Sequence, residues 1–232
     1  MKTHLLAAAA AGLLSTAANG AFVAWQAPVL ISGASDVNTQ GNYFGSWAPY
    51  NGGASSTPVN GVSFQGFSDL PSLSGGFDDG GGYWNNHNTP DANYNTLLSY
   101  GGYLFSSNNM TFSWGGMIPG NTYLVELWIA DPRSIGNSRA ATVFSGDGDL
   151  SGVMNYPADG SSHGSYLIGT FVAGASGSQS LTIDPSQNGD PNSGSAQLNL
   201  FQVRDLGVVP EPASVGLFGA GLLGFLMRRR RD

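Results

Sequence analysis

Short stretches in which apolar and polar residues alternate recur along the middle of this chain and constrain its fold more than any other feature. Residues 110–114 and 123–129 are the clearest of them. Further stretches span residues 59–67, 165–173 and 196–206. Because successive side chains of a strand point to opposite faces, this period of two predicts strands with a buried face.

Turn residues separate these stretches. The chain of 232 residues contains 35 glycines, and Pro119-Gly120 predicts a tight turn between two strands. One short helix is predicted within residues 91–102, where Tyr94, Leu97 and Leu98 have helical spacing. Eight or more short strands with so little helix predict an all-β fold, a β-sandwich of two packed sheets.

Charge and cysteine content exclude several classes of protein. Residues 22–209 contain thirteen acidic residues and three arginines, a net charge of −10. Such a body repels phosphate backbones, so we expect no nucleic-acid partner. The chain has no cysteine, which excludes disulfides, thiol chemistry and thiolate metal sites.

The N-terminus has the layout of a secretory signal peptide. Lys2 precedes an uninterrupted run of small and apolar residues from Leu5 to Leu14, and more small residues follow. We expect cleavage between Ala18 and Ala21, so residues 1–21 are the predicted signal peptide. The Sec translocon and signal peptidase are then partners. The alternative is a buried N-terminal helix.

The C-terminus combines three features in order. Pro210-Glu211-Pro212 precedes an uncharged stretch, residues 213–227, and Arg228, Arg229, Arg230 and Arg231 follow it. A helix of that length spans about 22 Å, less than the ~30 Å hydrocarbon core of a membrane. Arginines resist translocation and stay cytoplasmic. The stretch therefore predicts a marginal transmembrane helix that acts as a temporary tether, and a permanent anchor is the alternative.

These three features all lie within residues 207–232, and together they resemble the PEP-CTERM sorting signal. The resemblance implies recognition by the membrane enzyme exosortase, removal of the tail, and transfer to the cell surface or extracellular matrix. It also implies a Gram-negative-type bacterium that makes exopolysaccharide.

The body, residues 22–206, has a second resemblance. Residues 117–133 are similar to the central hairpin of galactose-binding-like jelly rolls, in which a Pro-Gly turn leads into a strand that ends in Asp. Residues 165–173, 181–184 and 198–206 resemble the closing strands of that fold. The resemblance implies a jelly-roll sandwich, flanked here by the signal helix and the transmembrane helix. Many families with this fold bind sugars, although a fold does not by itself determine function.

Residues suited to catalysis are few. His87 and His163 are the histidines left after signal cleavage, and neither lies in a recognised nucleophile or metalloprotease motif. Asp78 and Asp79 are adjacent, so on a strand they point apart, whereas glycosidases need two facing carboxylates. We therefore expect no enzymatic activity and no cofactor.

A weak calcium motif lies at Asp147, Asp149 and Ser151, which repeat the first half of an EF-hand loop and precede Gly152. Ala158 stands where the bidentate glutamate belongs. A solvated acidic hairpin is therefore the favoured interpretation, and the metal prediction is none.

The loop at residues 77–94 contains the aromatic and amide groups that sugar sites use, with Tyr83, Trp84 and His87 among turn residues. Trp84 can equally cover the core. Asp131 and Arg133 follow a central strand and suit either a loop ion pair or a ligand contact. These five residues are the candidate ligand-binding set.

Taken together, the sequence predicts an exported, non-catalytic protein of the cell surface or matrix, with a structural or carbohydrate-binding role. Exopolysaccharide is the candidate ligand, and the membrane is a partner before processing. A secreted hydrolase that acts on extracellular polysaccharide is the alternative.

Overall fold

The computed structural model describes residues 21–48, 56–66, 78–79, 87–104, 109–132, 134–146, 148–159, 163–187 and 195–208. The predicted signal peptide, the sorting tail and its transmembrane helix lie outside these residues, as do Tyr83, Trp84, Arg133 and Asp147. No helix in the described part of the chain is long and apolar enough to cross a membrane.

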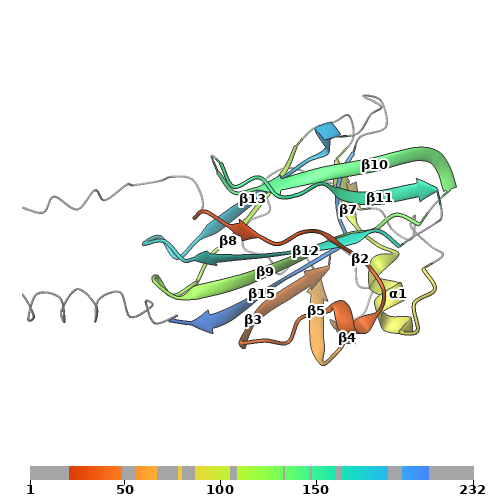
Figure 1. Ribbon diagram of the computed structural model, residues 1–232. Helices are drawn as coiled ribbons and strands as arrows, with labels where there is room; N and C mark the ends of the chain where they lie inside the picture. Colours follow the sequence, from red (N-terminus) through yellow and green to blue (C-terminus); the bar gives the residue numbers. More distant parts are fainter. Residues whose placement is uncertain are drawn as a thin grey trace, which may run out of the picture.

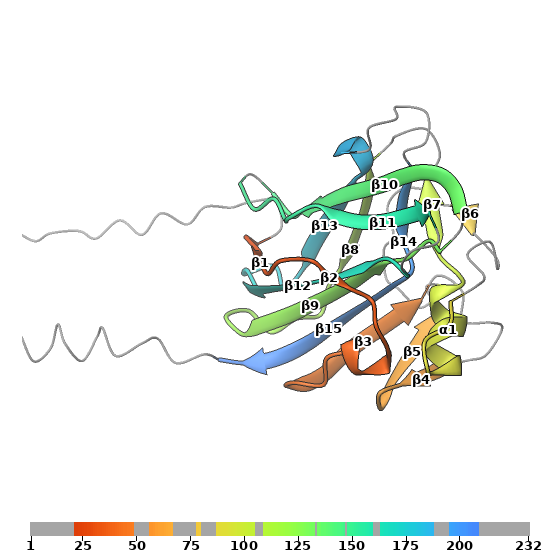
Figure 2. The same cartoon turned by 45° about the vertical axis from the view of Figure 1, so that its right-hand side comes forward.

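The described chain is mostly β-structure, as predicted, and forms three sheets. The largest contains, in spatial order, β1 (Ala24–Trp25), β12 (Ser165–Val172), β9 (Thr122–Ile129), β15 (Leu200–Gly207), β3 (Asn42–Ala48), β5 (Val62–Gly66) and β4 (Ser56–Val59), while β2 (Val29–Leu30) also pairs with β12. Its pairs are antiparallel except β3 with β5. Figure 2 shows β12, β9, β15 and β3 side by side.

The second sheet has the order β11 (Met154–Asp159), β10 (Ser134–Phe144), β13 (Gln179–Asp184) and β8 (Met110–Trp114). A small third sheet contains β14 (Ala196–Leu198), β7 (Gly102–Leu104) and β6 (Asp78–Asp79). Within the described residues the helical elements are α1 (Ala92–Leu98) and two short 3-10 turns, η1 (Ala34–Asp36) and η3 (Pro185–Gln187).

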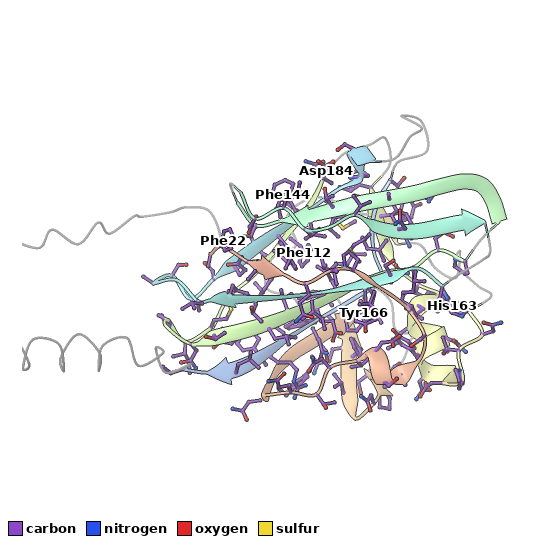
Figure 3. The ribbon with its side chains drawn as sticks, in the orientation of Figure 1. Phe22, Phe112, Phe144, His163, Tyr166 and Asp184 are labelled. Carbon is purple, nitrogen blue, oxygen red and sulfur yellow. The ribbon has the colours of Figure 1, made fainter. Side chains whose placement is uncertain are left out.

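The main core lies between the first two sheets, which gives the body its two layers (Figure 1). The predicted faces are confirmed: Met110, Phe112 and Trp114 of β8 are all buried in this core. Phe112 packs against Phe201 of β15, with ring centroids 5.0 Å apart, and Figure 3 shows its place between the sheets. Truncating a buried aromatic of this kind costs about 3–5 kcal/mol.

A second, smaller core lies on the opposite face of the large sheet. Trp128 of β9 packs there against Phe64 of β5, at a centroid distance of 6.0 Å. Tyr94, Leu97 and Leu98 of α1 belong to the same core. Consequently β9 is buried on both faces, including the polar side chain of Glu126.

The predicted helix is confirmed as α1. Asp91 caps it, since its Oδ1 accepts a hydrogen bond from the Tyr94 N–H at 2.8 Å. At the other end, the Ser99 N–H donates to the Asn95 carbonyl at 3.0 Å.

The prediction of a single strand over residues 59–67 is wrong in one respect. The structure places a hairpin there, with β4 ending at Val59 and β5 beginning at Val62. Asn60 (φ 47°) and Gly61 (φ 75°) both adopt the left-handed conformation of a two-residue hairpin turn. The Asn-Gly pair is the sequence feature that specifies this turn.

The two ends of the described body lie together. β1 and the end of β15 both lie at the left-hand end of the molecule in Figure 2, and α1 lies at the other end. The predicted tail begins directly after β15, so it is attached to the end remote from α1.

Candidate functional site

Two polar sites stand out in the described chain, a histidine pair beside α1 and a groove on the large sheet. In the histidine pair, Nδ1 of His87 lies 3.2 Å from Nδ1 of His163, and the ring planes meet at 45°. His87 is 9% exposed, and His163 is half-buried. Figure 3 places His163 beside α1.

The backbone holds both histidines in position. His87 belongs to the segment that leads into α1, and Asn95 of that helix binds this segment: its Oδ1 accepts from the Thr89 N–H at 2.9 Å, and its Nδ2 donates to the Thr89 carbonyl at 2.9 Å. His163 precedes Gly164, whose φ of +114° suits only glycine. A Cβ at Gly164 would lie 2.3 Å from the Ile129 carbonyl oxygen.

Burial dominates the electrostatics of the pair. Burial, followed by the neighbouring His163, lowers the pKa of His87 to about 4, while the Leu98 backbone carbonyl and Asp131 act in the opposite direction. Burial also lowers the pKa of His163. Both rings are therefore neutral at pH 7, with lone pairs available.

Asp131 lies two residues after β9, close enough to His87 to act on the pKa of that ring, and is fully buried. Its Oδ2 is 3.3 Å from Nη1 of Arg139 on β10. The structure therefore brings the predicted residues His87 and Asp131 to one end of the body, and it pairs Asp131 with Arg139. Tyr83, Trp84 and Arg133 lie outside the described residues, and their role stays a prediction.

In the weak calcium motif, the side-chain oxygens that the structure describes accept hydrogen bonds from backbone N–H groups. Asp149 accepts from the N–H groups of Val23 (3.1 Å) and Ser145 (2.9 Å), and from the Ser145 hydroxyl. Ser151 Oγ accepts from the Val143 N–H at 2.9 Å. Among the residues that the structure describes, no group of three or more His, Asp and Glu could hold a metal ion. Asp147 lies outside the described residues, so the expectation of a solvated acidic hairpin without a metal stays a prediction.

The groove crosses the large sheet at its β3–β5–β15 edge and has a volume of about 460 Å³. Arg204 of β15 lines it, and so do exposed polar side chains. The described lining residues are Thr39, Tyr43, Asn60, Gly61, Val62, Ser63, Gln65 and Arg204. We call it the Arg204 groove.

Hydrogen bonds fix the main side chains of this groove. Arg204 lines the groove, and its Nε donates to the Gln40 carbonyl at 2.6 Å and its Nη2 to the Gly41 carbonyl at 2.8 Å. Tyr43 is 48% exposed, and its hydroxyl lies 3.1 Å from Ser46 Oγ. The ring is thus both accessible and held in one orientation.

Glu126 of β9 is paired with Gln202 of β15, two residues from Arg204, and is fully buried. Its Oε2 accepts from the Asn38 N–H at 3.0 Å and from Gln202 Nε2 at 2.6 Å, and its Oε1 is buried without a partner. Burial raises the pKa of Glu126 to about 7, Asp36 adds to the rise, and the hydrogen bonds and Arg204 oppose it. The groove therefore has a positive charge in its lining, and a carboxyl that titrates near neutrality interacts with that charge.

Sequence reasoning missed the Arg204 groove. Tyr43, Asn60 and Arg204 come from three segments that are far apart in the chain. The one available signal was that Arg204 is one of only three arginines between residues 22 and 209.

Residues 208–231 match the PEP-CTERM protein-sorting motif. This match supports the prediction from the tail: the motif indicates an exported protein that exosortase sorts, with a transient membrane anchor before processing. A comparison with curated proteins found no match.

Among solved structures, the chain is similar to the ANXUR1 and ANXUR2 extracellular domains from Arabidopsis thaliana. The first likeness has 10% identity, a TM-score of 0.43, and covers 82% of this chain and 52% of that one. The second has 11% identity, a TM-score of 0.44, and covers 79% and 49%. This chain thus spans about half the length of each.

A third similar structure is the CBM36-1 domain of a multidomain xylanase from the hindgut metagenome of Trinervitermes trinervoides. It has 17% identity and a TM-score of 0.27, and the match covers 45% of this chain and 75% of that one. All three likenesses are weak.

Proposed function

We propose that this protein is a non-catalytic component of the bacterial cell surface or matrix that binds extracellular polysaccharide in the Arg204 groove. The proposal includes a signal peptide at residues 1–21, a galactose-binding-like jelly roll at 22–206 and a processed tail at 207–232. The Arg204 groove is the observation that supports polysaccharide binding.

The chemistry of the groove suits a sugar chain. A sugar ring needs an apolar face to stack on, and its hydroxyls need planar donors and acceptors. Tyr43 offers the face, and Asn60, Gln65 and Arg204 offer the polar groups. Because the aromatic ring and the guanidinium are already held by hydrogen bonds, little conformational entropy is lost on binding.

The charge of the body indicates which sugars bind. With a net charge of −10 over residues 22–209, the body repels polyanions at long range. A neutral, hydroxyl-rich glycan is therefore the favoured ligand, and Arg204 then acts as a hydrogen-bond donor.

The Tyr43→Ala variant tests this function. We expect its affinity for the retained glycan to fall about tenfold, since an aromatic stacking surface of this kind contributes about 1–1.5 kcal/mol. Phe22→Ala is the matched control, because Phe22 is also an exposed aromatic, 64% accessible, at the tail end of the body. Glycan microarrays and isothermal titration calorimetry measure the effect.

Salt dependence gives a second readout of the same experiment. Binding of a neutral glycan is expected to stay constant when NaCl is raised from about 0.05 to 0.5 M, since no ion pair is screened. Equal glycan retention by Tyr43→Ala and wild type would rule out the groove as the binding site.

A further inference from the structure

We propose that His87 and His163 together chelate a divalent transition-metal ion of the Zn²⁺ type. The spacing of the two ligand atoms is the first argument. Zn²⁺ binds imidazole nitrogens at about 2.0–2.1 Å in tetrahedral geometry, so two such nitrogens lie about 3.3 Å apart. The Nδ1 atoms of His87 and His163 are 3.2 Å apart.

The far side of His87 is the second argument. Its Nε2 is buried, and no group of the described chain meets hydrogen-bond geometry with it, so the Leu98 carbonyl that raises the pKa of this ring acts from a longer distance. A neutral ring that ligates through Nδ1 carries its proton on Nε2, which points away from the metal. Metal ligation through Nδ1 of both rings therefore leaves the proton of each ring on Nε2.

Rigidity of the two backbone segments is the third argument. Asn95 holds the segment of His87 through Thr89, and the glycine-only conformation of Gly164 holds His163. Preorganised ligands lose little entropy when the metal binds. His163 is half-buried, so the ion can reach the pair from solvent.

The coordination sphere that results is open. Within the described chain no third His, Asp or Glu completes the pair, and Asp131 is engaged by Arg139. Two positions of a tetrahedral ion are then left for water or for an outside ligand. Imidazole ligands favour Zn²⁺ over Ca²⁺ and Mg²⁺, which prefer oxygen.

Titration of the purified protein with Zn²⁺ tests the proposal. We expect one ion per chain and a rise in melting temperature of about 5 °C at saturation. His87→Gln and His163→Gln are each expected to weaken Zn²⁺ binding at least about tenfold, because a single imidazole remains. The change in melting temperature on metal addition is compared within each variant, so a destabilised variant still gives a result.

Nitrogen NMR of the wild-type histidine rings separates chelation from a simple hydrogen bond between the two rings. With saturating Zn²⁺, both rings are expected as the Nε2–H form. A hydrogen-bonded pair instead keeps a proton on one Nδ1. Persistence of that Nδ1–H signal, absence of Zn²⁺ binding, or undiminished binding in the double variant would overturn the metal site.

Discussion

The Glu126→Gln variant is expected to gain about 3 kcal/mol in stability relative to the wild type as the pH rises from 4 to 8. In the folded protein the pKa of Glu126 is raised to about 7, chiefly by burial, from an ordinary value of 4.5. The folded state therefore holds this proton more tightly than the unfolded state. The wild-type stability that depends on Glu126 is fully present below pH 4.5 and is lost as the pH rises through 7.

Urea unfolding of both proteins at closely spaced pH values measures this effect. The difference at pH 4 serves as the internal control, because Glu126 is then largely protonated in both states and the amide is its close isostere. Gln202 and the Asn38 N–H, which contact Oε2, are present in both proteins. A difference in unfolding free energy that does not change with pH would show that Glu126 is not a neutral buried acid.

Replacing Arg228 to Arg231 with serine is expected to remove most of the protein from the cell surface and leave its tail uncleaved. Each arginine costs about 2.5–3.5 kcal/mol to place in the membrane, so four of them stop the chain with a barrier of about 10 kcal/mol. Serines offer no such barrier. Cell fractionation and mass spectrometry of the C-terminus in the native host measure the outcome.

The four-lysine variant is the matched control for this experiment. Lysine keeps the charge and resists translocation equally, so it is expected to preserve the stop. If the serine variant is processed and displayed on the surface at wild-type levels, the arginine cluster does not stop translocation.

The sequence-based predictions succeeded where one local pattern determines the structure. Alternation in residues 110–114 correctly predicted the buried face of β8, and alternation in residues 123–129 correctly predicted one of the two buried faces of β9. The helical spacing of Tyr94, Leu97 and Leu98 correctly predicted α1. Both patterns depend only on neighbouring residues and on burial of apolar side chains.

The predictions failed where tertiary packing or turn chemistry determines the local structure. Glu126 occupies a polar position in its strand, yet α1 and η1 cover that face of β9 and bury it. The pattern of residues 59–67 predicts one strand, because the apolar residues on both sides of Asn60-Gly61 continue the alternation. The dipeptide itself specifies the hairpin turn.

Both candidate sites depend on contacts between distant segments. His87 and His163 are 76 residues apart, and the Arg204 groove joins β3, the β4–β5 hairpin and β15. No spacing rule within one sequence relates such positions. The sorting motif, by contrast, is contiguous, so the sequence alone identifies it, and residues 208–231 match it.

A glycan microarray probed with the purified protein, followed by mass spectrometry of the retained glycans, tests the central claim most directly. The proposed function predicts that a hydroxyl-rich glycan is retained through the Arg204 groove and recovered at its full length. Recovery of shortened glycans would identify a hydrolase instead, and retention of no glycan at all would contradict the proposed function.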